Sequence, residues 1–372
     1  MRILVWQWGR FGTGARYAFE LANALSDVGH ESLLSLAEGA ELMQNPTVRS
    51  AVDLPLHTYA TAPEFVRRSI NINRVLAPMV ASLRARPPDA AIVTMMGYWD
   101  IVFIHHLQRI GVPVVVLLHD AQVHLGDRFH LMVRLQRRII RRSEGVITLT
   151  DFVAEQLRAR VSLAGKVHAT IPHPVLDFAD LELSAPVLPE IAPDRPLRLL
   201  MAGRLKRYKG LDLFAAALRS IGNDAKLSVR VVGSSDDDRD LHSLRAIPGV
   251  EFDLGWKSDR EIIAHLDWAD ATVLPYVDAS QSGVVPLSFK RGRPVIVTPV
   301  GGLPEQVENG KTGIVTEDAS PSAIAAAIRT FAQDRQLLRR YAENALLHAC
   351  DEISWGALAP VFADTLQKVS RH

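Results

Sequence analysis

The chain has 372 residues, with 42 Lys and Arg against 41 Asp and Glu and one cysteine, Cys350. This length exceeds what one hydrophobic core usually reaches, so we expect two domains, and the near-zero net charge argues against a general nucleic-acid binder. One cysteine excludes an internal disulfide and a cysteine-built metal site, which favours a reducing compartment, the cytosol. We find neither a signal-peptide pattern nor the roughly 18 uninterrupted apolar residues of a spanning helix, so we expect a soluble or membrane-surface protein.

The chain opens with a pattern typical of a strand, a glycine turn and a helix. Residues 2–8 are an apolar run, glycines follow at 9, 12 and 14, and apolar side chains then recur at helical spacing up to residue 29. Apolar bursts at 90–96, 112–120 and 145–150 alternate with longer amphipathic stretches. This alternation predicts a parallel sheet with helical crossovers, and hence an α/β domain over residues 1–183.

A proline-rich stretch separates the two halves. Four prolines fall within eleven residues of the segment 184–198, which fits neither a helix nor a central strand and is predicted to be a domain linker. The alternation of strands and helices restarts after it, so we expect a second α/β domain over residues 199–354.

The glycine turn of the first domain is a candidate phosphate site. Gly12 and Gly14 form a G-x-G pattern that lets backbone N–H groups approach a phosphate at a helix N-terminus. The third glycine and the later acidic residue of a dinucleotide-binding turn are missing, which argues against NAD. Arg10 and Arg16 flank the turn and favour an anionic ligand, although a purely structural tight turn stays open.

A basic loop opens the second domain. After Gly203 come four cations in six residues, Arg204, Lys206, Arg207 and Lys209, at the carboxyl end of a predicted strand. Open α/β sheets bind ligands at that end, and an arginine fork combined with a mobile lysine suits a diphosphate. A solvated basic loop is the alternative.

Two longer motifs carry a family resemblance. GRLKRYKG at 203–210 and SGVVPLSFKRGRPVIVTPVGGLPEQVENGKTGIV at 282–315 resemble the family 4 retaining glycosyltransferases, as do LLHD at 117–120, VITLTDFVAEQL at 146–157 and the closing ISWGALAPVF. The resemblance implies the GT-B fold, an α/β architecture of two Rossmann-like domains with parallel sheets facing a central cleft. It also implies an acceptor domain at 1–183, a nucleotide-sugar donor domain at 199–354, and a last helix at 355–372 that crosses back to the first domain.

The resemblance also assigns roles to residues. Arg204 and Lys209 would grip the donor diphosphate and stabilise the leaving nucleotide, without a metal or a cofactor. His119 would lie beside the donor sugar. The remaining assignments are Gly12, Gly14, Gly203, Ser280, Gln281, Ser282, Gly283, Val284 and Glu305 on the donor side, and Arg10, Arg16 and Asp120 on the acceptor side.

One departure from the family concerns its two glutamates, which are separated by seven residues. The matching positions here are Ala279 and Leu287, or Ser280 and Ser288 after a one-residue slip, and Asp278 lies one residue before the first of them. In one interpretation the run 280–284 binds the donor with hydroxyls, an amide and backbone N–H groups. In the other, donor binding is lost and the protein is a silent scaffold of a polysaccharide-assembly complex. We favour the first because Arg204, Lys209 and His119 are retained.

Two arginine-rich stretches, 63–88 and 128–144, alternate basic and apolar residues. Such helices can lie on an anionic membrane surface, or they can be core-facing helices with a solvated basic back. The acidic run 234–240 is interpreted as a solvated helix start rather than a metal site.

Taken with the family resemblance, these features predict a retaining glycosyltransferase that uses GDP-mannose or a UDP-sugar. We expect it to act on a glycan or lipid-linked acceptor in exopolysaccharide synthesis, at the inner face of the plasma membrane. A nucleotide-sugar epimerase is the weaker alternative.

Overall fold

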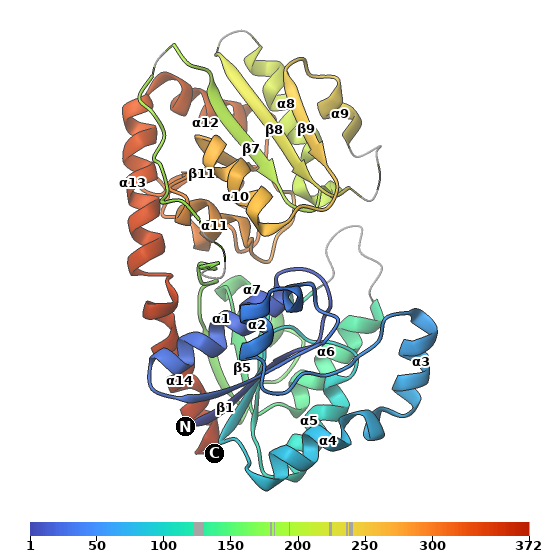
Figure 1. Ribbon diagram of the computed structural model, residues 1–372. Coiled ribbons are helices and arrows are strands. Elements are labelled where there is room, and N and C mark those ends of the chain that lie inside the picture. Colours follow the sequence, from blue (N-terminus) through green and yellow to red (C-terminus); the bar gives the residue numbers. More distant parts are fainter. Residues whose placement is uncertain are drawn as a thin grey trace. The chain divides into compact units, whose positions relative to one another are not determined.

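The computed structural model describes residues 1–122, 130–178, 181, 183–192, 194–222, 225–235, 237 and 241–371, with side chains in the second range from residue 132. The chain divides into two compact α/β units. Unit 1 contains Met1–Val123, Phe129–Asp180 and Trp355–His372, and unit 2 contains Leu181–Ser354. In Figure 1 the sequence colours distinguish them, because unit 1 is mainly blue to green and unit 2 green to orange-red.

Unit 1 is built on a parallel sheet with the order β2-β1-β3-β4-β5-β6. Its strands are β1 Arg2–Gln7, β2 Glu31–Leu36, β3 Ala90–Val93, β4 Val114–Leu118, β5 Gly145–Thr148 and β6 Val167–Thr170. The apolar bursts predict β1, β3, β4 and β5. No such burst predicts β2 or β6, because the serines of β2 and the half-buried residues of β6 break the apolar pattern.

Helices cover both faces of this sheet. They are α1 Gly14–Asp27, α2 Pro46–Ala51, α3 Ala62–Ile70, α4 Ile72–Ala85, α5 Asp100–Arg109, α6 His130–Arg142, α7 Asp151–Arg158 and α14 Trp355–Ser370, with the 3₁₀ turn η1 Glu41–Gln44. The last helix, α14, packs against α1 (Figure 1), and it also packs against β3, β4 and β6. Trp6 of β1 instead meets Phe103 of α5, with ring centres 5.3 Å apart.

Unit 2 has a second parallel sheet with the order β12-β11-β10-β7-β8-β9. Its strands are β7 Leu197–Ala202, β8 Leu227–Gly233, β9 Val250–Leu254, β10 Ala271–Leu274, β11 Val295–Val297 and β12 Gly313–Val315. Its helices are α8 Leu211–Ile221, α9 His242–Arg245, α10 Asp259–Trp268, α11 Val284–Lys290, α12 Pro321–Gln333 and α13 Arg335–Asp351, with the 3₁₀ turns η2 Arg207–Lys209 and η4 Pro304–Gln306.

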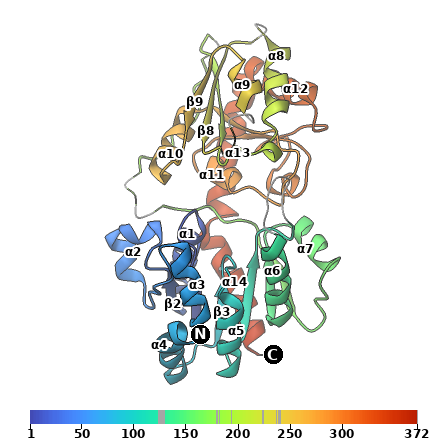
Figure 2. The ribbon, with the colours of Figure 1, turned by 90° about the vertical axis from the view of Figure 1, so that its right-hand side faces the viewer.

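Alternate residues of β7 enter two different cores. Leu197, Leu199 and Met201 pack with residues of α8 and α12, which lie side by side in Figure 2. Leu200 and Ala202 pack with Leu266 and Ala269 beyond the other face. This two-sided burial explains why the strand is apolar throughout rather than alternating, as is usual for the centre of a parallel sheet.

In each sheet the strand order reverses direction at one point. In unit 1 this switch lies between β1 and β3, and in unit 2 it lies between β7 and β10. Open α/β sheets bind ligands beyond the carboxyl ends of the strands at such a point. The two six-stranded parallel sheets confirm the predicted α/β architecture, and they direct attention to the residues that follow β1, β3, β7 and β10.

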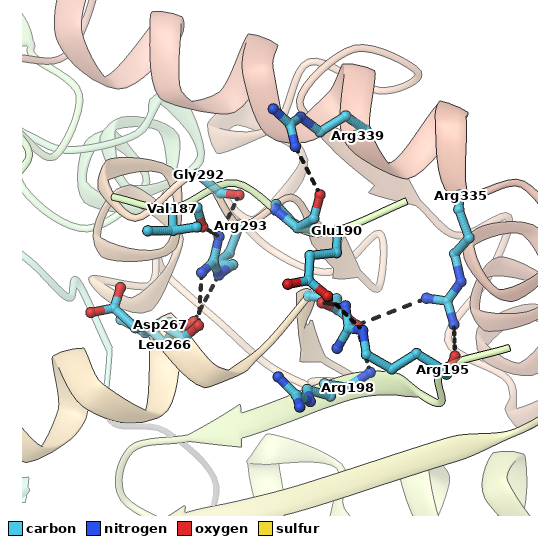
Figure 3. A network of polar contacts seen from close by, with 12 residues as sticks. Val187, Glu190, Arg195, Arg198, Leu266, Asp267, Gly292, Arg293, Arg335 and Arg339 are labelled. Carbon is cyan, nitrogen blue, oxygen red and sulfur yellow. Dashed lines mark hydrogen bonds and ion pairs between the residues drawn. The ribbon is translucent and has the colours of Figure 1, made fainter. Parts of the chain in front are cut away.

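The proline-rich segment 184–198 lies against unit 2, and its last two residues begin β7. Figure 3 shows its polar contacts, in which arginines donate to the carbonyl groups of the segment. Arg293, which is 2% exposed, donates to Val187 O at 2.7 Å, and Arg339 donates to Pro189 O at 3.1 Å. Arg195 pairs with the buried carboxylate of Asp270 at 2.7 Å. The segment is therefore fixed along much of its length.

The two basic stretches form helices on unit 1. Residues 63–88 form α3 and α4, separated at Asn71, and the described part of 128–144 belongs to α6, since 128 and 129 lie outside the described residues. In α3 none of the nine residues is buried. None of the described helices is long and apolar enough to span a membrane.

Candidate active site

The glycine turn of unit 1 is shaped by Gln7, the last residue of β1. A Cβ atom on Gly9 would lie 2.4 Å from Gln7 Nε2, and one on Gly14 would lie 3.0 Å from the same atom. Gly12 meets no such obstacle, but its φ of +84° belongs to the left-handed region that favours glycine. A side chain at Gly9 or Gly14 would thus require the end of the Gln7 side chain to shift, whereas Gly12 is favoured for its backbone conformation.

His119 follows β4 and contacts the loop after β3. Its Nε2 donates to the carbonyl oxygen of Thr94 at 2.9 Å, so this nitrogen carries the proton. Burial lowers the pKa of His119, against the opposing effect of Asp120. The ring is therefore neutral near pH 7, with Nδ1 as its remaining acceptor.

Three buried polar atoms near these residues lack a hydrogen-bond partner among the described residues. They are Gln7 Oε1, Thr94 Oγ1 and the hydroxyl of Tyr17. Gln7 ends β1, Thr94 follows β3, and the ring of Tyr17 is 5.7 Å from that of His119. Buried polar groups are nearly always satisfied, so these atoms mark the switch point of unit 1 as a candidate for water or ligand binding.

The three residues predicted on the acceptor side have different surroundings. Arg10 Nη1 donates to Tyr59 O at 2.8 Å and to Ala60 O at 2.7 Å, which ties the glycine turn to the loop before α3. Arg16 is buried, and its guanidinium lies 3.5 Å from Glu20 Oε1. Asp120 is half-buried beside His119. The anionic ligand expected next to Arg16 stays a prediction.

An aromatic band runs beside the glycine turn. The guanidinium of Arg10 lies 5.1 Å from the ring centre of Phe11 and 5.6 Å from that of Tyr59. Phe65 continues the band, with ring centres 4.9 Å from Tyr59 and 5.6 Å from Tyr98. At its ends Phe11 is 69% exposed and Tyr98 is 41% exposed. The band thus presents two accessible aromatic side chains on a packed support.

In unit 2 the motif GRLKRYKG joins β7 to α8. Gly210 has φ +73°, and a Cβ on it would lie 1.6 Å from the carbonyl oxygen of Pro275, so the end of the motif packs directly on the chain after β10. Gly203 has φ +114° and lies near Val284, the first residue of α11. Arg204, the next residue, is exposed. The motif therefore carries its cations past the ends of β7 and β10, at the switch point of unit 2.

Lys209 points at Tyr276, which follows β10. Its Nζ lies 2.5 Å from the phenolic oxygen and 3.8 Å from the ring centre. Lys209 is 9% exposed and Tyr276 is fully enclosed. Burial raises the pKa of the Tyr276 hydroxyl, so the phenol is neutral and accepts from the ammonium. Tyr276 consequently fixes the position of the positive charge.

The predicted donor loop is organised by Ser282. Gln306 clamps its backbone, accepting from Ser282 N at 2.7 Å and donating to Ser282 O at 3.2 Å. The Ser282 hydroxyl accepts from Val284 N at 3.3 Å, and its carbonyl accepts from Val285 N at 3.2 Å. Two N–H groups at the start of α11 are therefore already bonded to the loop itself. The same hydroxyl lies 3.4 Å from Tyr276, which links the loop to Lys209.

The other residues of this loop differ in their burial. Ser280 is buried, Gly283 is exposed, and Gln281 Oε1 is a buried acceptor without a partner among the described residues. Ala279 is buried, and Leu287 packs with the apolar core behind β7. The side chain of Glu305 is exposed, and its neighbour Gln306 is the residue that clamps Ser282. Gln281 is thus the loop side chain with an acceptor left over for a ligand.

A second polar cluster could hold a metal by its composition. Glu308, His348 and Glu352 bring one potential ligand atom each to within 4.8 Å of one another. The Lys311 ammonium, however, lies 2.6 Å from Glu308, and His348 Nδ1 lies 3.2 Å from each carboxylate. We interpret this cluster as an ion-pair network.

The structure describes only part of the acidic run 234–240, since 236 and 238–240 lie outside the described residues.

Sequence reasoning missed Tyr276, Gln306, Gln7 and Thr94. One signal could have found Tyr276 and Thr94, because each lies just beyond the end of an apolar strand. These strands, β10 and β3, are the neighbours of β7 and β1, the first strands of their units. Gln7 and Gln306 carry no comparable signal. A lone glutamine in a strand or a 3₁₀ turn does not indicate its partner.

Two family models together match most of the chain. The model for glycosyl transferases group 1 matches residues 196–334, and the model for the glycosyl transferase 4-like domain matches residues 12–172. Among curated relatives, a D-inositol 3-phosphate glycosyltransferase of Streptomyces avermitilis is 27% identical over 302 residues, which cover 72% of this chain and 65% of the relative. An alpha-D-kanosaminyltransferase of Streptomyces kanamyceticus is 27% identical over 63% of this chain and 65% of its own length.

Solved structures share the fold over the whole chain. Anabaena Alr3699/HepE, solved with UDP and glucose, matches with a TM-score of 0.73 at 17% identity and covers 99% of this chain and 100% of its own. The sucrose-phosphate synthase of Thermosynechococcus elongatus matches with a TM-score of 0.69 at 20% identity, covering 99% and 98%. The chain belongs to the group 1 glycosyltransferases of family 4 and has the GT-B fold.

Proposed function

We propose that the protein transfers a sugar, with retention of configuration, from a nucleotide-sugar donor to a glycan or lipid-linked acceptor. The observation that carries this proposal is the pair of cations beyond β7, in which Arg204 is exposed and Lys209 is fixed by Tyr276. A paired arginine and lysine at the switch point of a parallel sheet suits a diphosphate. The names of the relatives, which describe transferases of different sugars, support the same class of reaction.

On the donor side, the two cations would stabilise the negative charge that develops on the leaving nucleotide. This role needs neither a metal nor a cofactor. Gln281 and Ser280 would bind hydroxyl groups of the donor in place of the glutamates usual in the family, and the unpartnered Gln281 Oε1 supports that assignment. Anabaena HepE was solved with UDP-glucose, which supports a UDP-sugar over GDP-mannose.

In the proposed reaction, the acceptor hydroxyl attacks the anomeric carbon from the side of the leaving group. Its proton passes to the departing phosphate oxygen as the bond from sugar to phosphate breaks. His119 would lie beside the sugar as a neutral ring, because burial lowers its pKa and Nε2 is engaged by Thr94 O. It would position the sugar by hydrogen bonding and would not donate a proton to the leaving group.

On the acceptor side, the aromatic band from Phe11 to Tyr98 supports a carbohydrate ligand. Aromatic faces present apolar surface with a fixed orientation, which suits the C–H face of a sugar ring. The exposed Val66 and Ile70 of α3, next to Arg67, add an apolar and basic surface that suits a lipid-linked acceptor at an anionic membrane. Synthesis of an exopolysaccharide at the inner face of the plasma membrane fits both features.

The competing function is a silent scaffold that has lost donor binding along with the glutamates. An epimerase is less favoured, because the described residues beside His119 and Lys209 offer no pair of acid and base carboxylates for it.

The testing experiment incubates the protein with GDP-mannose, UDP-glucose and related nucleotide sugars, with and without EDTA. We expect consumption of one donor in the presence of EDTA and a product that keeps the anomeric configuration. Failure of every donor would favour the scaffold, and an epimerised nucleotide sugar would favour the epimerase.

A further inference from the structure

A single buried carboxylate on α1 bonds to three separate segments of unit 1. Glu20 is 6% exposed, and its Oε2 accepts from Asp177 N at 2.7 Å and from Trp355 Nε1 at 2.8 Å. Its Oε1 accepts from Phe178 N at 3.0 Å and lies 3.5 Å from the Arg16 guanidinium. Both oxygens are therefore fully engaged in charge-assisted contacts.

These partners lie where the main chain enters and leaves unit 2. Asp177 and Phe178 are the last described residues before Leu181, and Trp355 directly follows Ser354. One carboxylate thus holds the unit 1 residues at both ends of the segment Leu181–Ser354.

The backbone at one of the two ends is strained. Phe178 has a φ of 50°, a conformation that costs a residue with a side chain on the order of 1 kcal/mol or more. Its N–H is held by Glu20, and its ring lies 4.5 Å from the Arg16 guanidinium. Such a conformation persists only where the surroundings enforce it, and the hydrogen bond from Phe178 N to Glu20 is one of the contacts that do so.

The same anchor is in packing contact with His119. Tyr17 lies one turn before Glu20 on α1, and its ring meets the Trp355 ring edge-on at 5.3 Å and the His119 ring at 5.7 Å. His173 packs on the same tyrosine at 5.5 Å. A continuous chain of contacts therefore runs from Glu20 through Trp355 and Tyr17 to His119.

We propose that Glu20 is a positioning residue for glycosyl transfer, because it binds the backbone of Asp177 and Phe178 and holds Trp355 against Tyr17, whose ring packs on His119. The inference rests on the proposed function. A glutamine at this position has the same shape but only one acceptor oxygen. Its NH₂ group would face a donor N–H, and at least one of the four contacts would be lost.

The matched control is Glu144. Its Oε2 accepts from Val114 N at 2.8 Å and its Oε1 from Gln108 Nε2 at 2.7 Å, so it is also a carboxylate that anchors backbone in unit 1. Val114 begins β4, so Glu144 lies at the amino end of the strands, away from His119. The substitution Glu144→Gln therefore removes the same kind of group without touching the contacts of His119.

The experiment compares Glu20→Gln with Glu144→Gln in the full-length protein. We expect Glu20→Gln to lower kcat at least ten-fold while the dissociation constant for UDP stays within two-fold of the wild-type value. We expect Glu144→Gln to leave kcat and this dissociation constant unchanged, although it loses a similar amount of unfolding free energy. A second readout needs no activity: the ring NMR signals of His119, assigned with His119→Gln, should shift in Glu20→Gln and not in Glu144→Gln. If the wild-type protein turns over no donor, the proposed function fails. The His119 signals then still show whether Glu20 influences His119 through Trp355 and Tyr17. Unchanged signals, or an unchanged kcat in an active protein, would overturn the inference.

Discussion

The ammonium of Lys209 lies 2.5 Å from the phenolic oxygen of Tyr276 and 3.8 Å from the centre of its ring. The two residues are 67 positions apart and meet because β7 and β10 are neighbours in the sheet of unit 2. The contact fixes a cation in a mostly buried place, next to the hydroxyl of Ser282. It gives the donor loop a polar framework that does not depend on a carboxylate.

The first prediction concerns that contact. Tyr276→Phe removes the acceptor for Lys209 and keeps the ring beneath the ammonium, so the lysine loses one hydrogen bond worth about 1 kcal/mol. We expect kcat/KM for the donor to fall roughly five-fold. Tyr341→Phe, whose ring packs on Phe331 in the core of unit 2, is the control and should leave kcat/KM unchanged. Equal kinetics for the two variants would contradict the assigned role of Tyr276.

The second prediction tests the aromatic band as the acceptor surface. Phe11→Ala and Tyr98→Ala remove the two exposed rings, and each should raise the KM for the acceptor roughly five-fold, since one aromatic contact contributes about 1 kcal/mol. The KM for the donor should not change. Trp256→Ala truncates an equally accessible aromatic residue of unit 2, 56% exposed, and serves as the control. An unaltered acceptor KM in both band variants would place the acceptor elsewhere.

The third prediction concerns the pH dependence of stability. Asp100 accepts from Trp6 Nε1 at 3.0 Å and from Gly97 N at 2.6 Å, and burial raises its pKa from 3.8 to about 6. The folded state therefore binds more protons than the unfolded state between pH 4 and 6, and its stability falls as the pH rises through that window. Ionising Asp100 costs the native state about 3 kcal/mol at pH 7.

Asp100→Asn cannot ionise, so its free energy of unfolding should rise relative to wild type as the pH increases from 4 to 7. Urea unfolding at several pH values measures this difference. Asparagine also loses one acceptor oxygen, but that loss is the same at every pH and does not alter the slope. A difference that stays flat between pH 4 and 7 would show that Asp100 is ionised throughout.

The fourth prediction concerns the proline-rich segment in Figure 3. Arg293 donates to Val187 O, Leu266 O and Asp267 O, and burial lowers its pKa to about 10, which still leaves it charged at neutral pH. Arg293→Leu would remove this donor from the three carbonyl groups, at a cost of about 3 kcal/mol in the free energy of unfolding. Cleavage by a protease within 183–192 should increase with it. Arg339→Leu removes a partly exposed arginine with a single hydrogen bond to the segment. It should change the free energy of unfolding and the rate of cleavage less than Arg293→Leu does.

The sequence predicts much of the fold because the strands of both sheets are buried on two faces. The apolar burst 112–120, which contains β4, stands out for that reason. The strands β2 and β6 escape prediction because the half-buried VHAT of β6 and the serines of ESLLSL lack a continuous apolar run. The glycines of the turn after β1 are recognisable in sequence, but only the structure shows that two of them lie against the end of the Gln7 side chain.

The candidate site is less predictable because its contacts join distant segments. Lys209 is identifiable in its motif, whereas its partner Tyr276 and the clamp from Gln306 to Ser282 depend on the order of strands. Arg16 is a second example. Its place beside a glycine turn predicts an anionic ligand, which stays a prediction, and only the structure shows its contacts with Glu20 and Phe178. A local pattern shows which charges are present, and only the tertiary fold shows what they face.

The most direct test of the central claim is a calorimetric titration with UDP and with GDP. We predict that one of the two nucleotides binds the wild-type protein, and that Arg204→Ala and Lys209→Ala each weaken this binding at least ten-fold with little change in the free energy of unfolding. The cations would then hold the diphosphate as proposed. Absence of binding of both nucleotides, or wild-type affinity in both variants, would contradict the assignment of this site to a nucleotide-sugar donor.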